Sequence, residues 1–216
     1  MVQEQEKNTE KKSRFANIPK SVVFVLGILV VAGLLWQGGR SETANRNPTG
    51  EIFPTVVGQS LEEEGVTLPA GVQGGPSILL VGYLQESQFD IDRWVMGFLQ
   101  AELDVQLLEV PTLPGLVPSF ISGWIDDGMR SGIPQEDWSL VVTVYGDAAK
   151  PIAEFTGTEN GRLARILLLD ENGRVLWFDD KGYSPRKVLA IRDVLNSRQV
   201  AEESAEGFAG VKGASS

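Results

Sequence analysis

Chemistry in this chain has to come from carboxylates, hydroxyls and cations, because its 216 residues include no cysteine and no histidine. Thiolate nucleophiles, imidazole bases and soft metal ligands are therefore absent. Their absence excludes disulfide exchange, thiol peroxidation and every catalytic triad that uses an imidazole. Most familiar classes of active site are thus excluded by composition.

Two pairs of neighbouring acids, Asp126-Asp127 and Asp179-Asp180, are the clearest candidates for acid–base or metal chemistry. Adjacent carboxylates point in different directions, and the sequence has no spaced calcium-binding loop. We interpret both pairs as solvent-facing acids, the common case at protein surfaces. We therefore expect no bound metal and no cofactor.

Ser87 is the candidate nucleophile. Without histidine, its base would have to be a lysine or a carboxylate. Asp90 follows three residues later at the start of an apolar-periodic segment, and this spacing is typical of a helix start. The sequence predicts that Ser87 is a helix N-cap and not a nucleophile.

The overall charge argues against nucleic acid as a partner. Lys and Arg number 19 against 29 Asp and Glu, so the formal net charge is −10. A nucleic-acid-binding protein has to neutralise phosphates with cations, and this chain has the opposite balance. We expect no nucleic-acid partner.

Apolar runs of strand length alternate with segments in which apolar residues recur every three or four positions, which predicts strands alternating with helices. The predicted strands are 77–83, 105–110, 138–145, 163–169 and 175–178. The predicted helices are 87–103, one from 114 that ends around the glycines at 128 and 132, 151–155 and one from 185. The turn sequence at 170–173 joins the last two strands into a hairpin. Helical crossovers between buried strands favour an α/β fold with a mixed central sheet and flanking helices.

Core side chains are expected on the inward faces of these elements. Leu99 falls within the apolar period of the helix 87–103 and is expected to point inward. Large aromatic residues within apolar periods are also expected in the core. They are Trp94, Trp124, Trp138 and Trp177.

The order of elements and two stretches of sequence resemble the thioredoxin superfamily. Residues 53–69 (FPTVVGQSLEEEGVTLP) resemble the N-terminal extension of its peroxiredoxin and membrane-tethered thiol-disulfide reductase branch, and residues 167–185 (LLLDENGRVLWFDDKGYSP) are similar to that branch's terminal hairpin. The strand end at 145–147 (YGD) is similar to one in the thioredoxin-like assembly factors of mitochondrial ATP synthase. The resemblance covers about residues 51–198 and implies a thioredoxin-like fold.

The chain departs from this family at the site of its chemistry. Where the family carries its catalytic cysteines, residues 84–90 read LQESQFD, so there is no sulfur to oxidise. The family's cis-proline would align near Arg165. We expect Arg165 to pair with Asp90 or Asp92, or to present a binding surface at the former active-site face. The candidate partner contacts are Gln88, Asp90 and Arg165.

A membrane helix is predicted near the N-terminus. Residues 21–39 are uncharged, mostly apolar on all faces and bracketed by Lys20 and Arg40. As a helix, such a run spans about 30 Å, the thickness of the hydrocarbon core. We favour an uncleaved signal anchor over a cleaved signal peptide, because no small-residue cleavage site follows Trp36.

Charge placement around this helix predicts the topology. Cations are concentrated before the helix, so the positive-inside rule puts residues 1–20 in the cytoplasm and the rest of the chain in the periplasm of a bacterium with a single inner-membrane span. Composition divides that remainder into a linker at 40–50, the domain at 51–198 and a disordered tail at 199–216.

Three functions follow from these observations. The leading hypothesis is a membrane-anchored, redox-inactive thioredoxin-like domain that binds protein and assists assembly of a membrane complex. The alternatives are a cofactor-independent enzyme using carboxylates and Arg165, and a structural subunit of a membrane complex. An apolar patch around Gln88, Asp90 and Arg165 would favour binding, a deep acidic pocket an enzyme, and a closed polar surface a structural role.

Overall fold

The computed structural model describes residues 42–72, 74–115 and 119–213 of the chain. The predicted cytoplasmic segment, 1–20, and the predicted transmembrane helix, 21–39, lie outside the described residues. Within the part of the chain that is described, no helix is both long enough and apolar enough to cross a membrane.

Seven strands of the described chain form one sheet in the order β2-β1-β5-β4-β3-β6-β7. The neighbouring pairs β3–β4 and β4–β5 are parallel, and the other pairs are antiparallel. The strands are β1 (Val56–Ser60), β2 (Gly65–Leu68), β3 (Ser77–Gly82), β4 (Gln106–Pro114), β5 (Val142–Gly146), β6 (Arg165–Leu169) and β7 (Val175–Asp179). The predicted mixed central sheet is confirmed.

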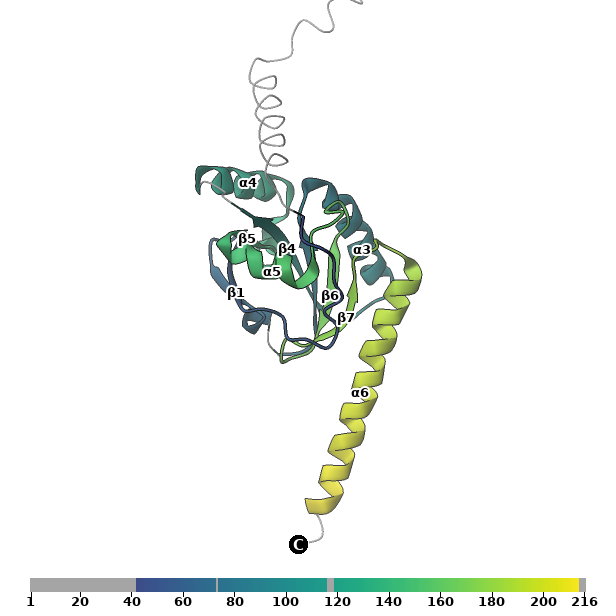
Figure 1. The fold of residues 1–216 in the computed structure, drawn as a ribbon. Coiled ribbons are helices and arrows are strands. Elements are labelled where there is room, and N and C mark those ends of the chain that lie inside the picture. The colour runs from purple at the N-terminus through teal and green to yellow at the C-terminus, as the bar shows by residue number, and fades with distance from the viewer. Residues whose placement is uncertain (1–41, 73, 116–118, 214–216) are drawn as a thin grey trace, which may run out of the picture. The chain divides into compact units, whose positions relative to one another are not determined.

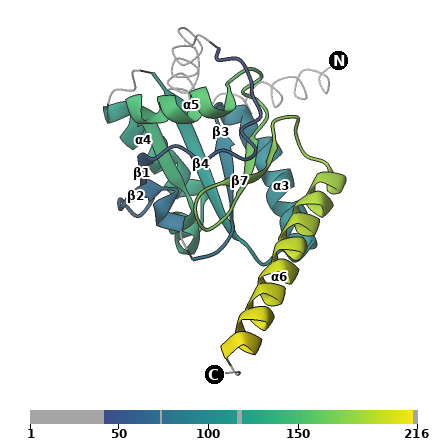
Figure 2. The same ribbon diagram turned by 60° about the horizontal axis from the view of Figure 1, so that its bottom comes forward.

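The described α-helices follow β3, β4, β5 and β7 along the chain. They are α3 (Gln88–Gln100), α4 (Ser119–Gly132), α5 (Lys150–Thr156) and α6 (Pro185–Gly213), and the short 3-10 turns are η1 (Ala70–Val72), η2 (Gln85–Ser87), η3 (Gln135–Leu140) and η4 (Asp147–Ala149). In Figures 1 and 2, α5 covers one face of the sheet while α3 and α6 lie toward the other.

Two hydrophobic cores lie on the two faces of the sheet. In β3, Leu79 and Val81 belong to the core that contains Ile152 of α5, whereas Ile78 and Leu80 belong to the core formed with α3 and α6. All four of these strand residues are at most 1 % exposed. Burial on both faces explains why this strand is a continuous apolar run and not an alternating pattern.

The predicted strand 138–145 begins later than expected. Only Val142–Gly146 forms β5, and η3 occupies most of the first half of the predicted strand. The Nε1 of Trp138 donates to the carbonyl of Ile133 at 3.0 Å, a contact made from within the turn. The apolar residues of η3 and of β5 follow one another without a break, so the sequence pattern did not show where the turn ends and the strand begins.

The expectation of four core tryptophans is only partly correct. Trp94 is fully buried, and it packs edge-on against Trp177 with ring centres 6.0 Å apart. Trp177 and Trp138 are half-buried, and Trp124 on α4 is 40 % exposed. A residue's place in an apolar period gives its helix face, but it does not give how completely other elements cover that face.

The C-terminal helix is longer than the sequence predicts. α6 begins at Pro185 as expected, but it continues to Gly213, so the described part of the predicted disordered tail, 199–216, is helical. This part of the sequence contains alanine and glutamate, which favour helix without any apolar stripe. The prediction of disorder was drawn from its small, polar and acidic composition and from the missing stripe.

The predicted linker, 40–50, is attached to the domain over its described residues. We call residues 42–46 the strap. The backbone N–H of Thr43 donates to Thr158 Oγ1, and the backbone N–H of Thr158 donates to the carbonyl of Thr43, both at 2.8 Å. The compact unit accordingly starts at Glu42 and not at 51.

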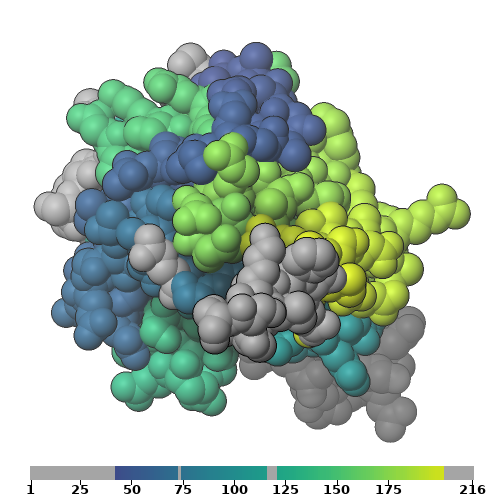
Figure 3. All heavy atoms as spheres, turned by 90° about the horizontal axis from the view of Figure 1, so that it is seen from below, coloured from purple at the N-terminus to yellow at the C-terminus, as the bar shows by residue number. Residues whose placement is uncertain are grey.

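The residues that follow the strap are held by the turn between β6 and β7. The N–H of Gly50 donates to the carbonyl of Val175, and the N–H of Phe53 donates to the carbonyl of Gly173, each at 2.8 Å. Figure 3 shows this N-terminal part (purple) against the hairpin (light green). These bonds fix the beginning of the domain to its last two strands.

Candidate functional site

The C-terminal end of β3, where the family resemblance places the catalytic cysteines, is closed. Tyr83 and Ser87 at this end are each 2 % exposed. Residues 157–164, which we call the α5–β6 loop, lie over it, since a Cβ added at Gly161 would be 3.1 Å from Leu84 Cγ. At Tyr83 and Ser87 the place of the family's chemistry is therefore interior, whereas Gln88 and Phe89 of the same segment are exposed.

Ser87 occupies the N-cap position of α3, as its spacing predicts, but its side chain does not cap the helix. It lies in η2 with helical backbone angles, and it makes no capping hydrogen bond to α3. Its Oγ instead donates to the carbonyl of Leu84 at 2.6 Å. Gly82 makes room for it, because a Cβ there would lie 2.6 Å from that Oγ. Buried and bonded to a backbone carbonyl, Ser87 closes the turn.

Arg165, the first residue of β6, is fully buried. A guanidinium has five N–H groups, and each of these has an acceptor, four on the α5–β6 loop and one on the strap. Nε donates to the Gly157 carbonyl (3.3 Å), Nη1 to the carbonyls of Leu163 (2.8 Å) and Asn160 (3.4 Å), and Nη2 to the Glu159 carbonyl (2.6 Å) and Asn45 Oδ1 (3.0 Å). The loop thus wraps around one cation.

The predicted pairing of Arg165 with Asp90 or Asp92 is wrong. All five acceptors of Arg165 are neutral oxygens, and among the described residues no carboxylate forms a salt bridge with it. Burial lowers the pKa of Arg165, and complete hydrogen bonding makes a buried cation tolerable. An interior side chain cannot touch a partner, so Arg165 is not a surface contact.

Tyr83 lies beneath the guanidinium. Its ring centre is 5.5 Å from the Arg165 Cζ, within the range of a cation–π contact. Its hydroxyl hydrogen-bonds to Thr156 Oγ1 at 2.8 Å. Burial raises the pKa of Tyr83 to about 12, against the opposing effects of that hydrogen bond and of the nearby cation.

Asp90 is also interior, at 1 % exposed, so it is not a direct partner contact either. Its carboxylate accepts the backbone N–H of Ala164 at 3.2 Å and that of Tyr183 at 2.9 Å. Arg93 adds a longer contact at 3.4 Å. Asp90 therefore fixes α3 to the α5–β6 loop and to the segment that leads into α6.

Gln88 is the one candidate contact that is exposed. Its Nε2 donates to Asp92 Oδ1 at 3.0 Å and, at 3.5 Å, to Glu109 Oε2 on β4. Burial raises the pKa of Glu109, and the charge of Asp92 adds to this, while the bond from Gln88 opposes it. Gln88 thus joins two carboxylates beside the start of α3.

The outer face of α3 carries exposed apolar side chains. Phe89 is 75 % exposed, Met96 55 % and Leu99 63 %. Leu99 was expected to point inward and does not, because α3 directs Ile91 and Phe98 to the core and leaves this face uncovered. The sequence reasoning did not identify Phe89 and Met96 as exposed apolar residues. The available signal was that both fall outside the apolar period of the helix, on the face that points away from the core.

The two acid pairs are not wholly solvent-facing. Asp126 is 7 % exposed and accepts a 2.6 Å bond from the Tyr145 hydroxyl, and burial raises the pKa of both groups. Asp179 is 9 % exposed and accepts a 2.7 Å bond from Lys187 Nζ. Asp126 is buried beside its exposed neighbour Asp127, whereas Asp180 is as buried as Asp179 and accepts a 2.8 Å bond from Asn45 Nδ2.

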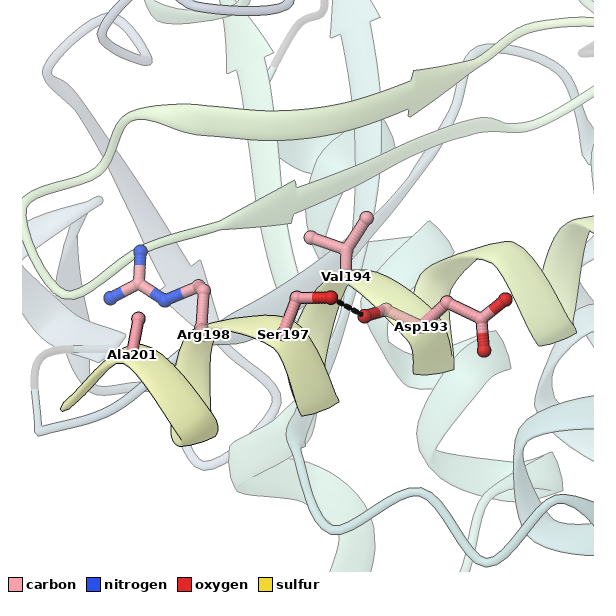
Figure 4. A pocket seen from close by; sticks show the side chains of 5 residues that line it. All are labelled: Asp193, Val194, Ser197, Arg198 and Ala201. Carbon is pink, nitrogen blue, oxygen red and sulfur yellow. Dashed lines mark hydrogen bonds between the residues drawn. The ribbon is translucent and has the colours of Figure 1, made fainter. Parts of the chain in front are cut away.

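No metal cluster is found in the described chain. No three or more His, Cys, Asp or Glu side chains there are placed to hold an ion. A shallow hollow runs along α6, where Ser197 Oγ donates to the carbonyl of Asp193 (Figure 4). Because one helix lines the hollow with one acid, it cannot bring two carboxylates to a substrate.

Sequence comparison finds no match: no protein-family model matches the chain, and no curated protein sequence matches it significantly. Solved structures do match it in fold. Yeast Sco1 with copper bound has a TM-score of 0.51 at 14 % identity, over 70 % of this chain and 95 % of that one.

Two bacterial structures are also similar to the chain. The thiol peroxidase from Chromobacterium violaceum has a TM-score of 0.49 at 11 % identity, over 76 % of this chain and 95 % of its own. The thioredoxin domain of a thiol-disulfide oxidoreductase from Bacteroides vulgatus has a TM-score of 0.47 at 13 % identity, over 69 % and 99 %. The similarity to yeast Sco1, a thioredoxin-like protein, confirms the fold implied by the resemblance, in a chain that has no cysteine.

Proposed function

We propose that this chain is a redox-inactive, thioredoxin-like protein-binding module, anchored in the bacterial inner membrane by residues 21–39 and assisting the assembly of a membrane complex from the periplasmic side. The observation that carries the proposal is the exposed apolar face of α3, which we define by Phe89, Met96 and Leu99. Apolar side chains gathered on one uncovered face are typical of interaction surfaces.

Several features favour binding over catalysis. The end of β3 is closed by the α5–β6 loop, and the charged groups beneath it, Asp90 and Arg165, are bonded to protein atoms. An enzyme using carboxylates and Arg165 would need these groups to reach a substrate. The apolar face of α3 begins directly beside this closed site and lies on a rigid helix. Such a surface can bind a protein without catalysing a reaction.

The anchoring part of the proposal rests on sequence. The apolar run 21–39 has the length of a bilayer span, and cations precede it. Protease added to spheroplasts should degrade the domain and leave residues 1–20 protected. Protection of the domain would overturn the periplasmic orientation.

Binding is tested by photo-crosslinking in cells that express the full chain. A photoreactive residue at Gln88 or Met96 should capture one dominant protein, and the same residue at Asn172, an exposed position on the β6–β7 turn, serves as the matched control. Leu99→Ser should abolish the adduct, while the circular dichroism spectrum stays unchanged because Leu99 is exposed. Adducts only from a probe at Ala32 would place the function in residues 21–39 instead.

The absence of redox activity has its own test. Reduction of insulin by dithiothreitol should be no faster with the protein than without it, because no thiolate is available to attack a disulfide. A clear acceleration would contradict the argument from composition.

A further inference from the structure

The apolar face of α3 is an elongated stripe, which Asp92 interrupts between Phe89 and Met96. At about 100° per residue, Phe89, Met96 and Leu99 fall within about 80° of arc, and at about 1.5 Å per residue they extend over about 15 Å. An elongated stripe of this kind matches the ridge that a second helix presents through residues spaced three, four and seven apart. Its shape therefore favours a helix as the occupant.

The charges around the stripe are mostly negative. Exposed carboxylates lie at its start (Glu86), within it (Asp92) and just after the helix ends (Glu102). Arg93 is the cation on this helix, and it is already engaged, since its Nη2 contacts Asp90 at 3.4 Å and its Nε donates to the Phe89 carbonyl. An occupant with cations beside its apolar residues would complement this face.

The same charges argue against other occupants. In a two-fold dimer through this face, the carboxylates of one copy would approach those of the other. An anionic lipid surface would likewise be repelled by Asp92 and its acidic neighbours. A formal net charge of −10 on the whole chain adds to both penalties.

We propose that the apolar face of α3 binds an amphipathic helix of a partner protein, one whose apolar residues are flanked by lysine or arginine. This inference rests on the proposed function, because it specifies the chemistry of the partner that the α3 face receives. The apolar side chains of the partner cover Phe89, Met96 and Leu99, and its cations meet Glu86, Asp92 and Glu102.

The lack of cysteine in the chain allows a direct test. Gln100→Cys, exposed at the end of α3, is labelled with an environment-sensitive dye in the full chain held in phosphatidylcholine nanodiscs. The probe is a synthetic amphipathic peptide of about 18 residues with leucines on one face and lysines beside them. Control peptides carry glutamate for lysine, or the same composition in scrambled order, and dye at Asn172→Cys reports binding elsewhere.

The lysine peptide should shift the dye emission at position 100 with a micromolar Kd and leave position 172 unchanged. The double variant Met96→Ser/Leu99→Ser should weaken binding by about tenfold or more. Asp92→Lys, and a rise from about 0.05 M to about 0.5 M salt, should each weaken it too. Since all three substituted residues are exposed, these variants are expected to fold.

Equal binding of the glutamate peptide or of the scrambled peptide would overturn the inference. So would a shift produced by phosphatidylglycerol nanodiscs without peptide, or a dimer in sedimentation that Leu99→Ser dissociates. If no peptide binds while the cellular adduct at Met96 persists, the partner has another chemistry and the proposed function stands. If the adduct is also absent, both fail.

Discussion

The side-chain amide of Asn45 connects the strap to the buried cation of β6. Its Oδ1 accepts from Arg165 Nη2 at 3.0 Å, and its Nδ2 donates to Asp180 Oδ2 at 2.8 Å. A carboxylate at this position could accept from the guanidinium but could not donate to Asp180. The amide meets both requirements, so the segment that precedes the domain completes the coordination of its most buried charge.

Removing the cation should destabilise the domain strongly. Arg165→Met would leave the four carbonyls of the α5–β6 loop and Asn45 Oδ1 without their donor inside the protein. We expect the free energy of unfolding of residues 42–216 to fall by about 3–5 kcal/mol, measured by urea denaturation. Arg165→Lys should restore only part of it, since an ammonium has fewer donors. A loss below about 1 kcal/mol would show that the loop does not depend on this cation.

The strap should contribute to stability although it was expected to be a linker. Asn45→Ala removes the acceptor of Arg165 and should lower the free energy of unfolding by about 1–3 kcal/mol. Asn45→Asp should be no milder, because it places a second carboxylate against Asp180. Urea curves of chains beginning at 42 and at 51 provide the comparison, and equal midpoints would mean that the strap is only a linker.

Tyr83 should make stability fall at high pH. Its pKa is raised by burial from 10.0 in an unfolded chain to about 12 in the fold, so the unfolded state loses its proton first as pH rises. The neutral phenol's contribution is complete below pH 10 and is lost between about pH 10 and 12, a change of about 2–3 kcal/mol. Urea titrations from pH 9 to 11.5 should show this slope, and Tyr83→Phe should make it shallower, with the remainder coming from Tyr145, whose pKa is also raised. An identical slope in both proteins would assign the effect to other groups.

Asp90 should hold two loops through their backbone. Asp90→Ala would leave the N–H groups of Ala164 and Tyr183 buried without an acceptor, at a cost of about 1–3 kcal/mol for each group. Amide hydrogen exchange at these two positions should accelerate more than at Leu167 in the middle of β6. Unchanged exchange at both would contradict the role given to this carboxylate.

Gly97 should be required for the contact between α3 and the segment leading into α6. A Cβ there would lie 2.7 Å from Tyr183 Cε2 and 3.1 Å from Val188 Cγ2. Gly97→Ala should therefore destabilise by about 1–2 kcal/mol despite its better helix propensity. Gly123→Ala is the matched control, since nothing lies within 4 Å of its added Cβ and α4 should gain up to about 1 kcal/mol. Equal effects of the two variants would indicate that α3 has room at this point.

The sequence alone determined what depends on residue type and on local repetition. The absence of cysteine and histidine removed redox and imidazole chemistry whatever the fold. The buried strands β3 and β6 and the turn at 170–173 were predictable, because continuous apolar runs and turn residues act over a few neighbouring positions. The order of these elements was enough to indicate a thioredoxin-like fold.

Tertiary structure decided the partners of the polar residues and the uncovered face of α3. Arg165 and Asn45 are 120 positions apart in sequence, and Asp90 and Tyr183 are 93 apart, so no local pattern could indicate either contact. Leu99 fits the apolar period of its helix, yet it is 63 % exposed, because none of the described elements packs over it. Periodicity records which way a side chain points along its own helix, whereas burial depends on what the rest of the chain places opposite.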